Sequence, residues 1–210
     1  VYLYRSVFTK GSAHEHPVRL RNTSLIPDED VRRYLAQMLK DGEDPRYKHN
    51  SLFQNKLLWI ARSFCRYGVN YAEISDTTLV KKYESIQMLK EVHEIMPYVT
   101  AETGVTLRFL AAMRRIPLTI VKDRIPPQDY LRQNLQVLQA VMYDPYVAGC
   151  DFVGEEINDI IELKPLIAEI VRLTVKEPDF VVRIHAGEND SLRDNIAHSI
   201  ACVRDSLMEC

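Results

Sequence analysis

Short apolar segments alternate with amphipathic helical segments along most of this chain, and this alternation limits its fold more than any other feature. The apolar segments begin near residues 69, 105, 147 and 181, at intervals of 34 to 42 residues. A segment of helical periodicity lies between each pair, and parallel strands require a crossover connection of this kind. The pattern predicts a parallel α/β sheet, either an open doubly wound sheet or part of an eight-fold (β/α)8 barrel of the TIM type.

Hydrophobic periodicity and helix-breaking residues set the expected boundaries of the elements. Strands are expected over residues 69–74, 105–110, 147–153 and 180–185. Helices are expected from about residue 50 to 68 and over 78–98, 128–142 and 157–173, the last with a bend at Pro165. A final helix is expected to begin at Ser191 as its N-cap and to bury one apolar face, made of Leu192, Ile196, Ile200, Val203 and Leu207.

The first fifty residues differ from the rest. A strand over residues 1–8 and a short helix over 28–40 are expected there, within an N-terminal segment or insertion covering 1–50. Residues 51–210 then contain four or five β/α units. An eight-fold barrel takes about 250 residues, so these units are expected to belong to a longer polypeptide and to be inactive alone.

Composition excludes several classes of partner. The chain carries 27 basic and 29 acidic side chains, a net charge of −2, which gives no reason to expect nucleic acid or an acidic membrane surface as a partner. Its longest apolar stretches are about five residues, far below the length of a membrane span. Its four cysteines form no CxxC pair and are expected to be reduced thiols of a cytoplasmic protein. A second copy of the chain is left open as a partner.

The most informative motif follows the expected strand over 180–185. His185 ends an apolar segment and Glu188 comes three residues later. In parallel β/α folds the carboxyl ends of the strands face the ligand. A neutral imidazole suits a transition metal, and a nearby carboxylate can move a proton. However, one histidine cannot hold a catalytic zinc, and a lone histidine at a strand end is more often a structural residue.

A second motif follows the preceding strand. Gly154 lies within the run from Asp151 to Glu156, where it would let a ligand approach the backbone, although an ordinary strand-to-helix turn is by itself the favoured interpretation. Arg183 shares one side of its strand with His185, and we expect it to pair with Asp151 on the adjacent strand.

These motifs together resemble the adenosine deaminase family. The resemblance rests on the tetrad His185-Ala186-Gly187-Glu188, the Asp-x-x-Gly-Glu-Glu run before it, and residues 71–75 and 107–114, in the family's order over residues 50–207. It implies a zinc-dependent hydrolytic deamination of adenosine or a related purine nucleoside or nucleotide. By position, His185 matches a Zn²⁺ ligand, Glu188 the residue that gives a proton to purine N1, and Gly154 the glycine whose amide meets N3.

The chain departs from the family at the remaining metal ligands. The family's His-x-His pair follows an apolar strand, whereas His14 and His16 lie between polar residues and Pro17, so they are weak candidates for ligands. The alternative function is a degenerate deaminase-like barrel that acts as an assembly or binding module, for example in a bacterial anti-phage complex. Retention of both His185 and Glu188 favours the enzyme. A cytidine-deaminase type of site is set aside because its P-C-x-x-C motif is missing.

Overall fold

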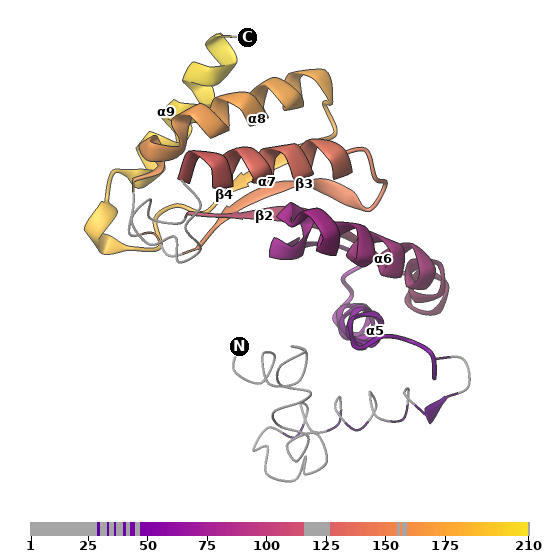
Figure 1. Ribbon diagram of the computed structural model, residues 1–210. Helices are drawn as coiled ribbons and strands as arrows, with labels where there is room; N and C mark the ends of the chain where they lie inside the picture. Colours follow the sequence, from indigo (N-terminus) through magenta and orange to yellow (C-terminus); the bar gives the residue numbers. More distant parts are fainter. Residues whose placement is uncertain are drawn as a thin grey trace. The chain divides into compact units, whose positions relative to one another are not determined.

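The computed structural model describes residues 47–115, 127–154, 156 and 159–209, with isolated positions between 29 and 44. These residues form five α-helices and four strands (Figure 1). In chain order the elements are α5 (Leu52–Arg66), β1 (Tyr71–Asp76), α6 (Lys82–Thr103), β2 (Thr106–Arg114), α7 (Pro127–Val141), β3 (Val147–Val153), α8 (Lys164–Lys176), β4 (Val181–Ile184) and α9 (Asn195–Met208). Three 3-10 turns, η2 (Thr77–Val80), η3 (Ile160–Leu163) and η4 (Asp190–Leu192), precede α6, α8 and α9. The strand expected over 1–8 lies outside the described residues, as does most of the helix expected over 28–40.

The four strands form one parallel sheet whose spatial order, β1-β2-β3-β4, is the order of the sequence. Ala112 of β2 pairs with Asp151 of β3, and Asp151 pairs in turn with Arg183 of β4. A helix lies between successive strands, as parallel pairing requires. The predicted parallel α/β architecture is therefore confirmed for the described part of the chain.

The chain divides into two compact units. One ends at Ala72 and includes Lys90–Thr106, and the other comprises Glu73–Leu89 and continues from Leu107. In the first, α5 begins with a capping box, in which the Ser51 hydroxyl accepts the Gln54 N–H and the Gln54 side chain accepts the Ser51 N–H. The Gln54 amide also donates to Glu94 on α6 at 3.1 Å, which ties the two helices together.

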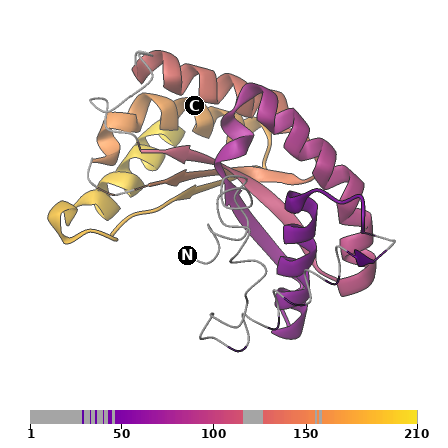
Figure 2. The ribbon, with the colours of Figure 1, turned by 60° about the horizontal axis from the view of Figure 1, so that its bottom comes forward.

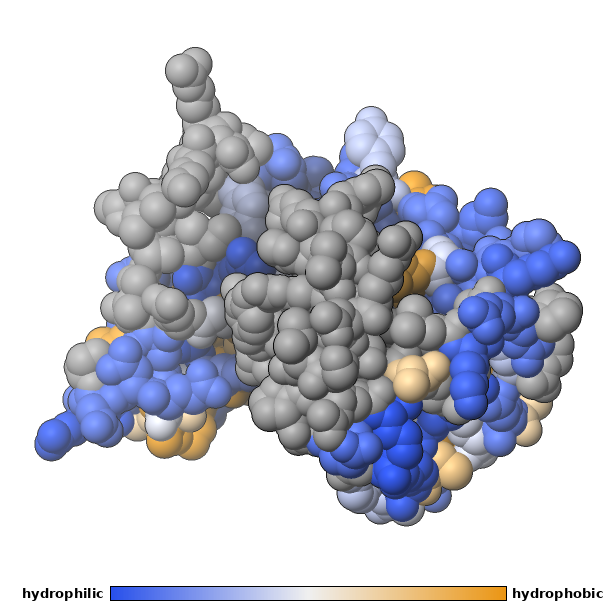
Figure 3. Space-filling view, turned by 90° about the horizontal axis from the view of Figure 1, so that it is seen from below, coloured by the Kyte–Doolittle hydropathy of each residue, from blue (hydrophilic) through white to orange (hydrophobic). Residues whose placement is uncertain are grey.

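The core of the second unit lies between the sheet and its helices. Figures 1 and 2 show α7 and α8 on the same face of β2–β4. β3 is buried along almost its whole length, and the fully buried side chains include Phe109, Phe152, Leu138 and Ile167. Outside, hydrophilic residues cover most of the coloured surface in Figure 3, with smaller apolar patches between them. Burial of this apolar face against the helices is what stabilises the sheet.

A glycine permits the close approach of β3 and β4. A Cβ atom placed on Gly149 would lie 1.9 Å from the carbonyl oxygen of Val181 on β4. Because that atom belongs to the backbone of the neighbouring strand, it cannot move aside without breaking the pairing. No residue other than glycine therefore fits at this position of β3.

Pro165 does not bend its helix as expected, and Pro97 lies within a helix that is longer than expected. Pro165 lies in the first turn of α8 and bends nothing, because a first-turn residue needs no N–H for a helical hydrogen bond. The expected helix over 157–173 is thus a 3-10 turn followed by α8. Pro97 lies inside α6, which continues past the expected end to Thr103 and is closed by Gly104 with φ of 70°.

The orientation predicted for the last helix is wrong. α9 begins after Asp194, and Ser191 lies in η4 instead of capping the helix. The expected buried side chains Ile196, Ile200 and Leu207 are exposed, whereas the buried face consists of Asn195, Ser199, Cys202 and Ser206. Small side chains allow close contact with α8, and the two serine hydroxyls donate to carbonyls one turn earlier, so the buried polar groups are satisfied.

Two expectations from composition also concern the described residues. Cys65, Cys150 and Cys202 carry free thiols, as expected from their spacing. None of the helices in the described part combines the length and the apolar character needed to cross a membrane.

Candidate functional site

His185 and Glu188 lie side by side at the carboxyl end of β4. The His185 N–H donates to the Phe152 carbonyl at 3.2 Å, which extends the β3–β4 pairing by one residue. The imidazole Nδ1 then lies 3.3 Å from the Glu188 Oε1. The two side chains are 36% and 60% exposed, so both are accessible. Gly187, with φ of 84°, makes the turn that brings them together.

A buried carboxylate, Asp151, lies on the other side of the imidazole. Its side chain is 1% exposed, and its Oδ2 is 3.2 Å from the His185 Nε2. The Ser75 hydroxyl on β1 donates to the same oxygen. Ser75 reaches it across β2 because the β2 residue paired with Asp151 is Ala112, whose side chain is small. Three strands thus contribute to one polar cluster.

One oxygen of this carboxylate is left without a donor. Asp151 Oδ1 is buried and has no hydrogen-bond partner among the described residues. A buried carboxylate oxygen without a partner costs free energy unless a cation or a further donor lies beside it. Carboxylates thus flank the imidazole on both sides, Asp151 at Nε2 and Glu188 at Nδ1. The arrangement favours a positively charged group at this position.

Among the described residues, Arg183 offers such a group close to Asp151. Its guanidinium lies 4.0 Å from Asp151 Oδ2, as expected, but its closer partner is Glu73 on β1, at 2.9 Å. The Arg183 side chain is 44% exposed, so it is only partly buried. Because Arg183 pairs more closely with Glu73 on β1, it neutralises the negative charge of Asp151 only in part.

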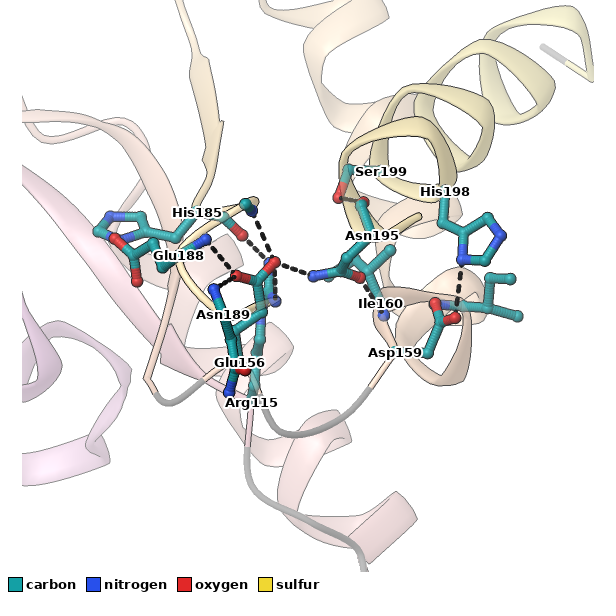
Figure 4. A network of polar contacts seen from close by, with 12 residues as sticks. Arg115, Glu156, Asp159, Ile160, His185, Glu188, Asn189, Asn195, His198 and Ser199 are labelled. Atoms are coloured by element: carbon teal, nitrogen blue, oxygen red, sulfur yellow. Dashed lines mark hydrogen bonds and ion pairs between the residues drawn. The ribbon is translucent and has the colours of Figure 1, made fainter. Parts of the chain in front are cut away.

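Behind His185 and Glu188, a second buried carboxylate holds the loop on which they lie. Glu156 accepts three successive backbone N–H groups, from Gly187 at 2.8 Å, Glu188 at 2.5 Å and Asn189 at 3.1 Å. The Asn195 amide, in the first turn of α9, donates to it as well. Figure 4 shows this carboxylate between the loop and α9. Glu156 thus joins the loop to the helix that follows it.

Arg115 completes this cluster from the end of β2. Its guanidinium lies 3.7 Å from Glu156 Oε1, with both side chains 1% exposed, and it donates to the His185 carbonyl. Burial raises the pKa of Glu156, but the hydrogen bonds from Asn195 and from the three backbone amides outweigh it and lower this pKa to about 2. Burial lowers the pKa of Arg115, which the Glu156 charge opposes. Glu156 is therefore ionised at neutral pH.

Gly154 lies at the same edge of the sheet as His185. It directly follows β3, has φ of 110°, and the preceding carbonyl, of Val153, accepts the Arg115 N–H at 2.8 Å. Because Phe152 pairs with Ile184, Gly154 and the His185 loop leave the sheet at the same level. The structure thus brings the three predicted site residues to one edge. His14 and His16 lie outside the described residues.

Sequence reasoning missed Glu156, Arg115, Asn195 and Ser75 as members of the site. Glu156 lay within the quoted motif, but nothing in the motif shows that it accepts backbone amides 31 to 33 residues later. A signal for Asn195 existed in the polar residues of the last helix, which recur at helical spacing through Ser199, Cys202 and Ser206. Within the described residues, no three histidine, cysteine or acidic side chains form a group suited to a metal ion.

Comparison of the chain with protein-family models, with curated proteins and with solved structures finds no match.

Proposed function

We propose that this chain supplies part of the active site of a zinc-dependent purine deaminase, which hydrolyses the amino group of adenosine or a related nucleoside or nucleotide. The observation that carries the proposal is the 3.3 Å contact between the His185 Nδ1 and the Glu188 carboxylate at the carboxyl end of a parallel strand. This is the edge of such sheets at which ligands bind. The resemblance to the adenosine deaminase family supplies the reaction.

The strand order supports a barrel as the setting of this site. A doubly wound sheet reverses its strand order at a switch point, whereas the four described strands follow one another in sequence order. Arg183 of β4 and Glu73 of β1 meet at 2.9 Å on one face of this sheet, where their long side chains span the two intervening strands.

The residues present fit part of a zinc site. His185 offers an imidazole, and the unpartnered Oδ1 of Asp151 marks a buried position where a cation would be stabilised. We propose that His185 holds the metal and that Asp151 balances part of its charge. A bound zinc ion supplies a nucleophile near neutral pH, because it lowers the pKa of its water. Catalytic zinc takes three protein ligands, so further ligands must come from outside the described residues.

Glu188 and Gly154 would act on the purine itself. In the proposed reaction the Glu188 carboxyl gives a proton to N1, which makes C6 more electrophilic. The oxygen of water then bonds to C6, and one proton of that water passes to the amino nitrogen. The bond from C6 to this nitrogen breaks, ammonia leaves, and the second water proton restores the Glu188 carboxyl. The Gly154 N–H would donate to N3 and orient the ring. Positioned proton transfer of this kind contributes about 10²–10⁴-fold to a rate.

The test measures ammonia release by the full-length natural polypeptide that contains this sequence, loaded with zinc and given adenosine, deoxyadenosine, AMP or ATP. Glu188→Gln should lower kcat by at least about 100-fold. Glu84→Gln is the matched control, since Glu84 is an exposed acid on α6, and it should leave kcat unchanged. Lack of ammonia release from all four substrates would refute the proposal and favour the assembly module.

A further inference from the structure

The loop from His185 to Asn189 is fixed by its backbone. Three consecutive N–H groups, those of Gly187, Glu188 and Asn189, point to the single carboxylate of Glu156. The carbonyl at the start of the loop, of His185, accepts a hydrogen bond from Arg115. Two buried side chains thus bind four of the loop's backbone groups, and these contacts hold its conformation.

Glu156 and Arg115 do not themselves reach the exposed side of the loop. Their side chains are 1% exposed, whereas those of His185 and Glu188 are accessible. In Figure 4 the Glu188 backbone faces Glu156 while the Glu188 carboxylate lies beside the His185 imidazole. A substrate that meets Glu188 would not touch Glu156. Any effect of Glu156 on turnover must therefore pass through the loop.

The strength of this attachment follows from charge. Hydrogen bonds to an ionised carboxylate are shorter and stronger than those between neutral groups, and Glu156 accepts four of them. The loop also contains Gly187 with φ of 84°, a conformation that costs little for glycine but gives the loop no rigidity of its own. Without the carboxylate, three N–H groups of the loop would lose their acceptor together.

We propose that Glu156 and Arg115 are positioning residues, which hold the 185–189 loop so that the Glu188 carboxylate and the His185 imidazole face the same substrate. The consequence for turnover rests on the proposed deaminase function, whereas the consequence for the loop does not. Misplacement of a catalytic group by about 1 Å can cost about 100-fold in rate.

The experiment compares wild type, Glu156→Gln and Glu84→Gln in the full-length polypeptide. Hydrogen exchange should become at least about tenfold faster at the amides of residues 187–189 in Glu156→Gln. The reason is that the neutral glutamine side chain is a weaker hydrogen-bond acceptor than the ionised carboxylate. Exchange in β2 and β3 reports global unfolding, so amides of residues 187–189 that exchange faster than these strands in Glu156→Gln but not in wild type separate loop release from global unfolding. In Glu84→Gln no amide of the loop should change.

Turnover gives the second measurement. Glu156→Gln should lower kcat by about 10- to 100-fold, with KM for the nucleoside changed less than threefold, since the groups that bind substrate remain. Arg115→Lys keeps the positive charge but loses the guanidinium fork, and it should release the loop less than Glu156→Gln does.

Unchanged exchange at residues 187–189 in Glu156→Gln overturns the inference, and so does faster exchange with an unchanged kcat. If wild type releases no ammonia while exchange at residues 187–189 responds as expected, the proposed deaminase function is refuted and the attachment of the loop by Glu156 stands. If Glu156→Gln does not fold, the smaller change Arg115→Lys decides the question by the same two measurements.

Discussion

Glu156 is expected to make the stability of this protein depend on pH in the acid range. Its ordinary pKa of 4.5 falls to about 2 in the folded chain, because the hydrogen bonds from Asn195 and from three backbone amides outweigh the effect of burial. At about 1.36 kcal/mol for each pH unit, this difference corresponds to about 3 kcal/mol of stability. The side chain is 1% exposed, so solvent screens little of it.

The direction follows from the lowered pKa. Between pH 4.5 and about 2 the unfolded chain binds a proton at this group that the folded chain does not. The contribution is therefore complete above about pH 4.5 and is lost as the pH falls toward about 2. Glu156→Gln cannot titrate, and it should be less stable than wild type by about 3 kcal/mol at pH 7 and by much less at pH 2.5.

Urea unfolding of wild type and Glu156→Gln at pH 7, 4 and 2.5 measures this gap directly. Glu84→Gln is the control, since Glu84 lies exposed on α6 and should differ from wild type by less than about 0.5 kcal/mol at each pH. A gap between wild type and Glu156→Gln that stays constant from pH 7 to pH 2.5 would show that the carboxylate charge is not what holds the loop. A gap below about 1 kcal/mol at pH 7 would contradict the hydrogen-bond geometry itself.

Four further substitutions test the packing and one buried hydrogen bond by urea unfolding. Gly149→Ala should cost at least about 2 kcal/mol, since the new methyl group meets a β4 carbonyl oxygen at 1.9 Å, and a cost below about 0.5 kcal/mol would mean that the strands are farther apart. Ile167→Ala, in the core, should lower the free energy of unfolding by about 2–5 kcal/mol. Ile200→Ala should lower it by less than about 1 kcal/mol, because Ile200 is 64% exposed. Equal losses would contradict the orientation given for α9. Ser75→Ala should cost about 1–3 kcal/mol, because it removes the hydroxyl donor to the buried Asp151, and no loss would place a different donor there.

The parallel sheet could be predicted from the sequence because each of its strands is a short apolar segment. β3 occupies the residues expected of it, 147–153, since a strand buried on both faces is a continuous apolar segment. The side of α9 that faces the core could not be predicted in this way. Helical periodicity shows that a helix has an apolar stripe, but the bond from Asn195 to Glu156 turns the polar side inward.

The candidate site was likewise predictable in part. His185 and Glu188 lie three residues apart at a strand end, so local sequence places them together. Asp151 and His185 are separated by 34 residues and meet only through the pairing of β3 with β4. Glu156 and Arg115 bind backbone atoms, and no residue type in the loop reveals which carboxylate will accept its amides. Contacts that depend on tertiary structure and on backbone groups leave no pattern in one sequence.

The Glu156 carboxylate is bound at both ends of the same short connection, by Asn189 and by Asn195. This gives the five residues between them a fixed length. One residue inserted there would lengthen the connection by up to about 3.5 Å and carry the Asn195 amide away from the carboxylate. These two hydrogen bonds therefore constrain the number of peptide units in the connection.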